Sequence, residues 1–269
     1  MQREREFKDH QNTIQQSSVQ GASYAINLQL LNKHRHVRLF IDEYAPLLSK
    51  LTSFPMDAKT AANIKYRLQQ RFPDFFTYTI TNQQGIPTLL DVDSLVGEAC
   101  QKDLKEFAKI VKNSNSSVQN NVFIHPQPFN YHFDIMSPLK TNTNTASLFF
   151  ASFYVKEITD ILKTHEIPGQ TLMIVKQSQP TLIEVSKEGT RDQISRAVNL
   201  TKEEQRLIRV YKNIPHSDWR LVALPDTEFE KQYLYSLWKE AFVVIFIVVL
   251  ALFLLMFVLI KYSKVRITD

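Results

Sequence analysis

The sequence predicts an α+β protein with a long N-terminal helix, an antiparallel sheet with flanking helices, and one C-terminal transmembrane helix. Apolar residues recur every three or four positions near the N-terminus, residues 54–226 alternate between short β-like runs and amphipathic helical segments, and residues 241–260 are continuously apolar. Turn residues between successive β-like runs favour hairpins, whose strands are antiparallel. The expected divisions are an N-terminal helix (1–53), a folded domain (54–226), a connecting helix (227–240), a transmembrane helix (241–260) and a cytoplasmic stub (261–269).

Residues 1–53 are expected to form the long helix. Ala22, Ile26 and Leu30 make one apolar stripe at helical spacing, and a second stripe follows it. Pro46 falls within the second stripe and should kink or interrupt the helix, because proline lacks the backbone N–H of a helix interior. The first part of the helix is polar and needs a partner, for which a second copy of the chain, in a homodimer, is one candidate.

The domain that follows contains strand and helix signals in turn. Apolar residues alternate with threonines over 76–80, and residues 82–85 then supply a turn. Further strands are expected from aromatic, β-branched or alternating content at 86–90, 122–124, 131–136, 147–154, 171–175, 182–185 and 219–224. Helical signals lie between them, at 64–68, 104–111, 158–162 and, from a capping-box sequence, 201–204. Residues 206–211 fit either a helix or a strand.

The chain ends in a membrane segment. Asp226 caps a final helix that has no stop signal before residues 241–260, so the two should form one continuous rod. A helix of that apolar length spans about 30 Å, the hydrocarbon thickness of a bilayer. Lys261, Lys264 and Arg266 follow it, and the positive-inside tendency therefore places the C-terminus in the cytoplasm and the preceding domain outside. The lipid bilayer is thus one expected partner.

Composition and motifs narrow the functional classes. The net charge of +5 is mild, and no Lys/Arg stripe with interleaved aromatics is present, so no nucleic-acid partner is expected. Cys100 is the single cysteine, which excludes an intrachain disulfide and a cysteine-based zinc site. The run of His34, Arg35 and His36 is interpreted as a solvated basic face rather than a metal site. The sequence has no glycine-rich phosphate loop, Gly-x-Ser-x-Gly or His-Glu-x-x-His motif, so neither enzymatic activity nor a cofactor is expected.

The two ends of the sequence conflict with a domain outside the cytoplasm. Residues 1–16 are hydrophilic and contain no apolar region of a signal peptide. Residues 261–269 are too few to form a cytoplasmic domain. We therefore expect this chain to be the front half of a longer protein that also has an upstream membrane helix and a downstream output domain.

One group of side chains is the candidate ligand-binding site. His132 and Asp134 lie two positions apart on a predicted strand, so they share one face of the sheet. They can contact a ligand, bind a metal or pair with each other, and the sequence leaves these alternatives open. Nearby aromatic residues can wall a pocket or belong to the core. The candidate ligand-binding residues are Tyr131, His132, Asp134, His125, Phe149 and Phe153.

Four stretches of the domain resemble a known family. They read TYTITNQQGIPTLLDVDSLVGEACQKDLKEF (77–107), FIHPQPFNYHFDIMSPL (123–139), SLFFASF (147–153) and DWRLVALPD (218–226). They are similar to the extracytoplasmic PAS-like sensor region of bacterial membrane signalling proteins, the Cache (PDC) type, and above all to the sensor halves of membrane diguanylate cyclases. The resemblance implies a long N-terminal helix packed on a central antiparallel sheet of about five strands.

The resemblance also implies a function. We expect an extracytoplasmic domain of a bacterial inner-membrane receptor that senses a small-molecule ligand, with an output such as cyclic-di-GMP synthesis supplied outside this chain. The ligands of the family are diverse, so the resemblance implies no particular one. The alternative is a non-signalling, membrane-anchored binding or interaction protein that uses the same fold.

Overall fold

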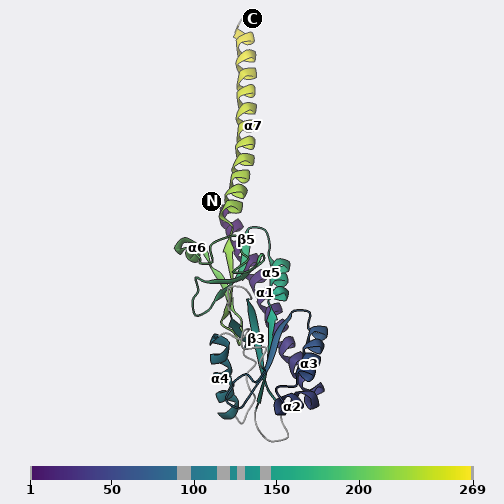
Figure 1. The fold of residues 1–269 in the computed structure, drawn as a ribbon. Helices are drawn as coiled ribbons and strands as arrows, with labels where there is room; N and C mark the ends of the chain where they lie inside the picture. The colour runs from purple at the N-terminus through teal and green to yellow at the C-terminus, as the bar shows by residue number, and fades with distance from the viewer. Residues whose placement is uncertain (1, 90–97, 114–121, 126–130, 140–146, 268–269) are drawn as a thin grey trace.

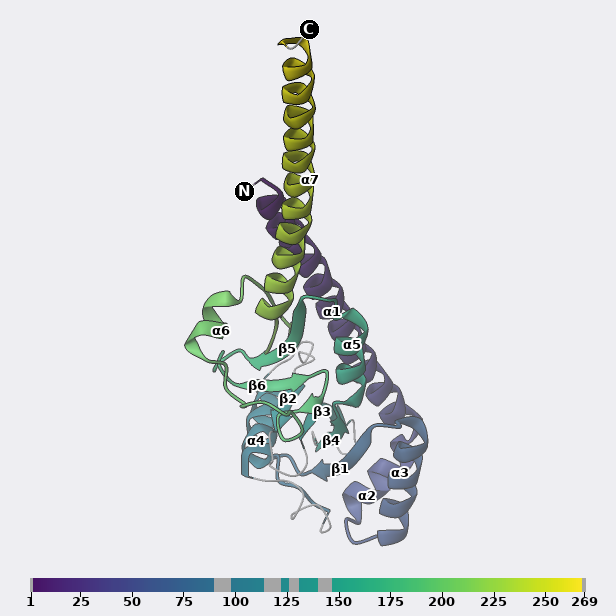
Figure 2. The same ribbon diagram turned by 90° about the horizontal axis from the view of Figure 1, so that it is seen from above.

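The computed structural model describes residues 2–89, 98–113, 122–125, 131–139 and 147–267 (Figure 1). They form an α+β fold with a long N-terminal helix, antiparallel sheets and one apolar C-terminal helix, as the sequence predicts. The long helices lie at opposite ends of the chain and meet near the N-terminus, as Figures 1 and 2 both show.

Helix α1 (Gln2–Glu43) lies against both sheets of the domain. Its inward face consists of apolar side chains at helical spacing, among them Val19, Ala22, Ile26, Leu30, Val37 and Phe40. The helix breaks at Tyr44, and α2 (Ala45–Ser53) begins with Pro46 in its first turn, where the missing N–H costs no hydrogen bond. The predicted interruption at this proline is therefore confirmed.

The predicted solvated basic face on α1 is wrong for His34. That side chain is 4% exposed, whereas Arg35 and His36 are exposed. The reason is helical geometry: residue 34 lies one turn after Leu30 and one turn before Val37, so it shares their buried face.

The first sheet has four antiparallel strands in the order β1-β4-β3-β2. Their bounds are β1 (Phe75–Thr81), β2 (Val122–His125), β3 (His132–Leu139) and β4 (Ser147–Tyr154). Helix α3 (Ala58–Arg71), capped by Asp57, contacts β1, and α4 (Glu98–Asn113) contacts β2 and β3. The predicted return strand at 86–90 is reduced to a single bridge between Thr81 and Pro87, and residue 90 lies outside the described residues. Two backbone hydrogen bonds flank this bridge, from the Asn82 N–H to the Ile86 carbonyl and from the Thr88 N–H to the Ile80 carbonyl.

The second sheet has five antiparallel strands in the order β7-β6-β5-β9-β8. Their bounds are β5 (Gln170–Lys176), β6 (Ile183–Ser186), β7 (Gly189–Thr190), β8 (Val210–Asn213) and β9 (Trp219–Pro225). Helix α6 (Lys202–Leu207) begins with the predicted capping box, in which the side chains of Thr201 and Glu204 each bond the other's backbone N–H.

Two sheets therefore replace the single sheet that the resemblance implies. Helix α5 (Lys156–His165) follows β4 and carries the chain from the first sheet to the second. Strand β5 then pairs with β9 and β6 and not with β4, so each sheet is completed by its own strands. One hydrophobic core, which includes Phe133, Phe153 and Trp219, nevertheless continues from sheet to sheet beneath α1.

Helix α7 (Thr227–Ile267) runs without a break from the end of β9 through the apolar segment, which confirms the predicted continuous rod. It projects away from the folded domain in Figures 1 and 2. Its span Thr227–Phe257 includes an 18-residue stretch with a mean hydropathy of 3.0, and none of that stretch is buried. Among the described residues, α7 is the one helix that is long and apolar enough to cross a membrane.

Candidate functional site

The strand register divides the predicted ligand-binding residues between two faces of the first sheet. His132 lies opposite Tyr154, and Asp134 lies opposite Ser152. Between these two pairs, Phe133 lies opposite Phe153. Because successive side chains of a strand point to opposite faces of the sheet, Phe133 and Phe153 lie on the face away from His132 and Asp134. The predicted pair of His132 and Asp134 therefore shares a face, but Phe149 and Phe153 point away from that pair.

The face that carries Phe149 and Phe153 is apolar and packs beneath α1. The Phe149 ring lies 6.1 Å from that of Phe40 on α1, and the Phe153 ring lies 5.3 Å from that of Phe72. Both side chains are fully buried. These two phenylalanines belong to the core, which is the alternative that the sequence left open for them.

The opposite face of the same sheet carries a group of buried polar side chains, here called the polar face, beside the apolar Met136 and Phe150. Six polar side chains on this face are each at most 6% exposed: Thr77, Thr79, Thr81, His132, Asp134 and Ser152. The Ser152 hydroxyl donates a hydrogen bond of 2.5 Å to Asp134, and His132 Nε2 lies 3.7 Å from the same carboxylate oxygen. Polar groups are costly to bury unless they are paired, so this face is a specialised part of the sheet.

His125 is the remaining histidine of the predicted set. Its backbone pairs with that of His132 across β2 and β3, while the placement of its side chain lies outside what the structure describes. Tyr131 directly precedes β3 and is 3% exposed. Among the described residues, Tyr131 is the one member of the predicted ligand-binding set that lines the cavity of the next paragraph.

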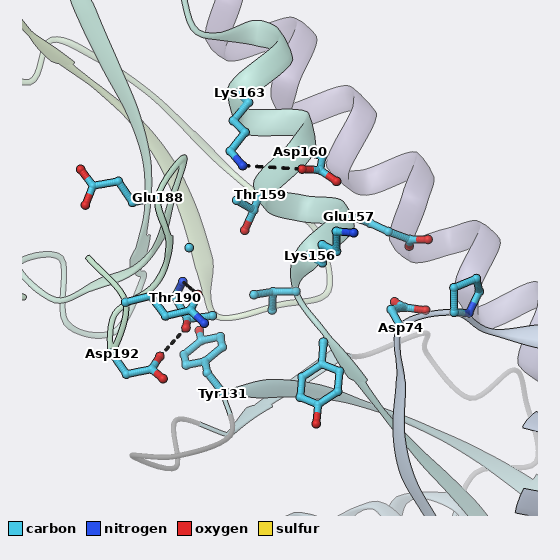
Figure 3. A pocket seen from close by; sticks show the side chains of 15 residues that line it. Asp74, Tyr131, Lys156, Glu157, Thr159, Asp160, Lys163, Glu188, Thr190 and Asp192 are labelled. Atoms are coloured by element: carbon cyan, nitrogen blue, oxygen red, sulfur yellow. Dashed lines mark hydrogen bonds and ion pairs between the residues drawn. The ribbon is translucent and has the colours of Figure 1, made fainter. Parts of the chain in front are cut away.

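A cavity of about 680 Å³ lies at the junction of the two sheets (Figure 3). Helix α5 forms one wall through Lys156, Asp160 and Lys163, and the segment around β7 forms the facing wall through Thr190 and Asp192. Tyr131 lies at the β7 side of the cavity, whereas Asp74, just before β1, lies at the far side. The buried floor and charged rim suit a small polar molecule.

A buried ion pair supports one side of this cavity. Lys33 Nζ lies 2.7 Å from Asp74 Oδ1 and 2.8 Å from Glu157 Oε2, and it also lies 5.2 Å from the centre of the Phe153 ring. Lys33 is 5% exposed, so α1, β1 and α5 meet around a charge that has left water. Burial raises the pKa of Asp74, and Lys33 offsets part of that rise.

A second buried carboxylate lies close to Tyr131. Glu184 on β6 is 1% exposed, and Arg191 lies 3.8 Å from its Oε2 atom. Burial raises the pKa of Glu184, with Arg191 opposing the rise. Burial also raises the pKa of Tyr131, and the charge of Glu184 adds to that effect.

Sequence reasoning missed Lys33, Asp74 and Glu184. One signal was available: Lys33 lies three residues after Leu30 and four before Val37, so a charged residue interrupts the buried stripe of α1. Asp74 and Glu184 offered no comparable signal, because their burial depends on contacts between elements far apart in the sequence.

No protein-family model and no curated protein sequence matches this chain. Solved structures do match its fold. The sensory domain of the Campylobacter jejuni chemoreceptor Tlp3 (CcmL) matches with a TM-score of 0.52 at 7% identity, over 85% of this chain and 98% of that one. The ligand-binding domain of the Pseudomonas fluorescens chemoreceptor CtaA in complex with L-isoleucine matches with a TM-score of 0.51 at 12% identity, over 87% and 99%.

A third match is the sensor domain of the V. cholerae histidine kinase DctB, with a TM-score of 0.50 at 10% identity, over 84% of this chain and 99% of that one. At such low identities, the likeness concerns the fold and not the residues of a site. The chain therefore has the fold of these sensor domains.

Proposed function

We propose that this chain is the extracytoplasmic ligand-sensing part of a bacterial membrane receptor. The observation that carries the proposal is a sensor-domain fold that continues directly into a membrane-length apolar helix. Strand β9 ends at Pro225, and α7 begins at Thr227. The cytoplasmic location of the C-terminus, from the positive charges after the apolar segment, is part of the same proposal.

The connection between the domain and α7 supports transmission of a signal. Asp226 accepts hydrogen bonds from the backbone N–H groups of Glu228 and Phe229, and its own N–H donates to the carbonyl of Gly169. The start of α7 is thus bonded to the turn before β5. A ligand that binds one arrangement of the domain more tightly than another would shift α7 through this connection.

We propose the buried polar face of the first sheet as the ligand site. It includes His132, Asp134 and Ser152, and a ligand-binding role of His125 belongs to the same proposal. Tyr131 lines the cavity instead, and Phe149 and Phe153 lie in the core on the other face. A carboxylate, an imidazole and hydroxyl groups can bind a small molecule that has an ammonium group and polar oxygens. Amino acids are the first class to test, since the matching CtaA domain was solved with L-isoleucine.

Thermal unfolding of the full chain in detergent micelles, with and without each amino acid, tests this site. A ligand present at 100 times its dissociation constant stabilises the folded state by about 2.7 kcal/mol. Asp134→Asn should remove most of that gain, because the ammonium group loses its counter-charge. Asp42→Asn, on the exposed side of α1, is the matched control. A ligand that stabilises the chain and its Asp134→Asn variant equally would place the site elsewhere.

We further propose that a second copy of the chain pairs along α1. Large apolar side chains form a stripe on the outer side of this helix: Tyr24, Leu28, Leu31 and Leu39. Such a stripe on a charged helix favours a helix partner. Light scattering of the full chain in micelles should show a dimer that Leu28→Glu and Leu31→Glu convert to a monomer. Lys65→Glu, at an exposed position on α3, is the control and should leave the dimer intact.

The output is a separate part of the proposal. Cyclic-di-GMP synthesis is one output to test, because the sequence resembles the sensor halves of diguanylate cyclases, whereas the matched structures belong to chemoreceptors and a histidine kinase. The cellular concentration of cyclic-di-GMP, measured with and without this gene, tests that output. A non-signalling interaction protein would change neither this concentration nor chemotaxis nor phosphorylation.

A further inference from the structure

The cavity at the junction of the two sheets has an excess of negative charge. Its lysines are Lys156 and Lys163, and the latter lies 3.9 Å from Asp160 on the same helix. The carboxylates that line it are more numerous: Asp74, Glu157, Asp160, Glu188 and Asp192. The buried Lys33 contacts Asp74 and Glu157 from behind and offsets only part of this charge. The cavity therefore favours a cation.

Two buried polar atoms of the lining have unused hydrogen-bonding capacity. Asp74 is 6% exposed; its Oδ1 atom accepts from Lys33, but its Oδ2 atom receives no hydrogen bond from any residue that the structure describes. Tyr131 is 3% exposed, and its hydroxyl, although it lies close to the buried Glu184, has no partner at full hydrogen-bond geometry within the described part of the chain. Buried groups of this kind are normally satisfied. A molecule in the cavity can satisfy both.

The size and shape of the cavity decide what kind of cation fits. About 680 Å³ is the volume of a small-molecule site and far larger than a bare metal ion needs. Among the described residues, no three His, Cys, Asp or Glu side chains gather as a metal-binding group. The carboxylates Asp74 and Asp192 lie on opposite sides of the cavity in Figure 3, so two positive charges separated by an apolar chain match them.

We propose that this cavity is a second binding site, for a small aliphatic amine that carries two or more ammonium groups. One ammonium group donates to Asp74 Oδ2, and the other donates to Asp192 and to the Tyr131 hydroxyl. The bound amine would connect α5, the start of β1 and the β7 segment, which come from both sheets. This site goes beyond the ligand-sensing role proposed above, because it depends on the cavity alone and not on the polar face around Asp134.

Calorimetric titration of the full chain in micelles with 1,4-diaminobutane and with spermidine tests the proposal. Saturable binding is expected for both amines. Butylamine, which has a single ammonium group, should bind about tenfold more weakly or worse, because one charge-assisted hydrogen bond is lost. In the Asp134→Asn variant, which lacks the amino-acid site proposed above, glycine should bind more weakly than the diamine, because its carboxylate would have to use Lys156 or Lys163. Magnesium chloride at equal ionic strength controls for general screening of charge.

Variants locate the binding. Tyr131→Phe keeps the ring and removes only the hydroxyl, and it should weaken diamine binding about tenfold. Because that hydroxyl lies close to Glu184, thermal unfolding of the variant without amine checks that it folds. Asp192→Asn, at the rim, should weaken binding by a similar factor. Glu203→Gln, which removes an exposed charge on α6 that does not line the cavity, should leave the affinity unchanged.

Three results would overturn the proposal. The first is no saturable binding of either polyvalent amine to the unmodified chain. The second is binding that Tyr131→Phe and Asp192→Asn leave unchanged, or that Glu203→Gln weakens equally, because both describe attraction to general surface charge. The third is tighter binding of glycine than of the diamine to the Asp134→Asn variant, in which the amino-acid site proposed above is impaired, because the lysines and not the carboxylates would then determine the ligand of this cavity.

Discussion

The rings of Phe7 and Tyr233 stack with their centres 4.0 Å apart and their planes 15° from parallel. Phe7 belongs to the first turns of α1, and Tyr233 belongs to α7 just before the apolar segment. The contact joins the two ends of the chain at the point where the domain meets the candidate membrane helix. A change in the position of α1 would therefore be felt directly by α7.

The coupling between these two rings is measurable. Phe7→Ala and Tyr233→Ala should each destabilise the packing of α1 on α7, and the double variant should lose less than the sum of the two. We expect a coupling free energy of about 0.5–1.5 kcal/mol from a double-mutant cycle in thermal unfolding. Strictly additive losses would show that the rings do not stabilise each other.

Replacing Lys33 by methionine should destabilise the fold strongly. The change leaves Asp74 buried without its counter-charge, and breaking a buried pair from one side costs about 3–5 kcal/mol. Adding Asp74→Asn should restore much of the loss, because the fully buried carboxylate is then gone, and the Glu157 side chain is 39% exposed and can be solvated. Urea unfolding of the three variants measures the effect. Equal stability of Lys33→Met and the double variant would argue against the ion pair as the cause.

His34 should make the domain less stable in mild acid. Its pKa is lowered to about 4, first by burial and then by the charges of Arg38 and His216. The unfolded chain takes up a proton near the ordinary histidine pKa, whereas the folded chain does not, so stability falls as the pH drops below about 6.5. At pH 5 the loss amounts to about 2 kcal/mol.

Urea unfolding at pH 7.5 and pH 5 checks this prediction. In His34→Leu, which has no proton to bind, the decrease in stability between the two pH values should be smaller by the same amount. The raised pKa values of Asp74 and Glu184 act in the opposite direction, because those groups favour the folded state on acidification. They are present in both proteins, so the difference between the proteins isolates His34.

Gly169 should tolerate no side chain. Its φ of +85° lies in the left-handed region, and a Cβ atom there would come within 2.7 Å of the Phe229 ring on α7. Gly169→Ala should therefore destabilise the domain by about 1 kcal/mol or more through backbone strain, and it should also displace the start of α7. Thermal unfolding measures the first effect. Gly21→Ala, at a glycine without a positive φ, is the comparison.

The sequence allowed the local structure to be predicted well, because local signals determine it. The interruption at Pro46, the capping box at Thr201 and the continuous rod from Asp226 each depend on residues a few positions apart. The division into two sheets was not predicted, because strand content alone does not say which strands pair. Only the register shows that β5 joins β9.

The candidate site was predictable in part for the same reason. That His132 and Asp134 share a face follows from strand periodicity. That Phe149 and Phe153 point away from them depends on the register of β3 and β4, which involves residues more than ten positions apart. The junction cavity combines Asp74, Tyr131 and Asp192 from three separate segments, and no sequence pattern connects them.

The length of α7 also sets the height of the domain above a bilayer. Residues 227–240 precede the apolar segment, and at 1.5 Å per residue they span about 20 Å along the helix axis. A bilayer interface of lipid headgroups on each side is only about 5–8 Å thick. The two sheets would therefore stand clear of the headgroups, so solutes would reach them by free diffusion in the surrounding water, without first partitioning onto the lipid surface.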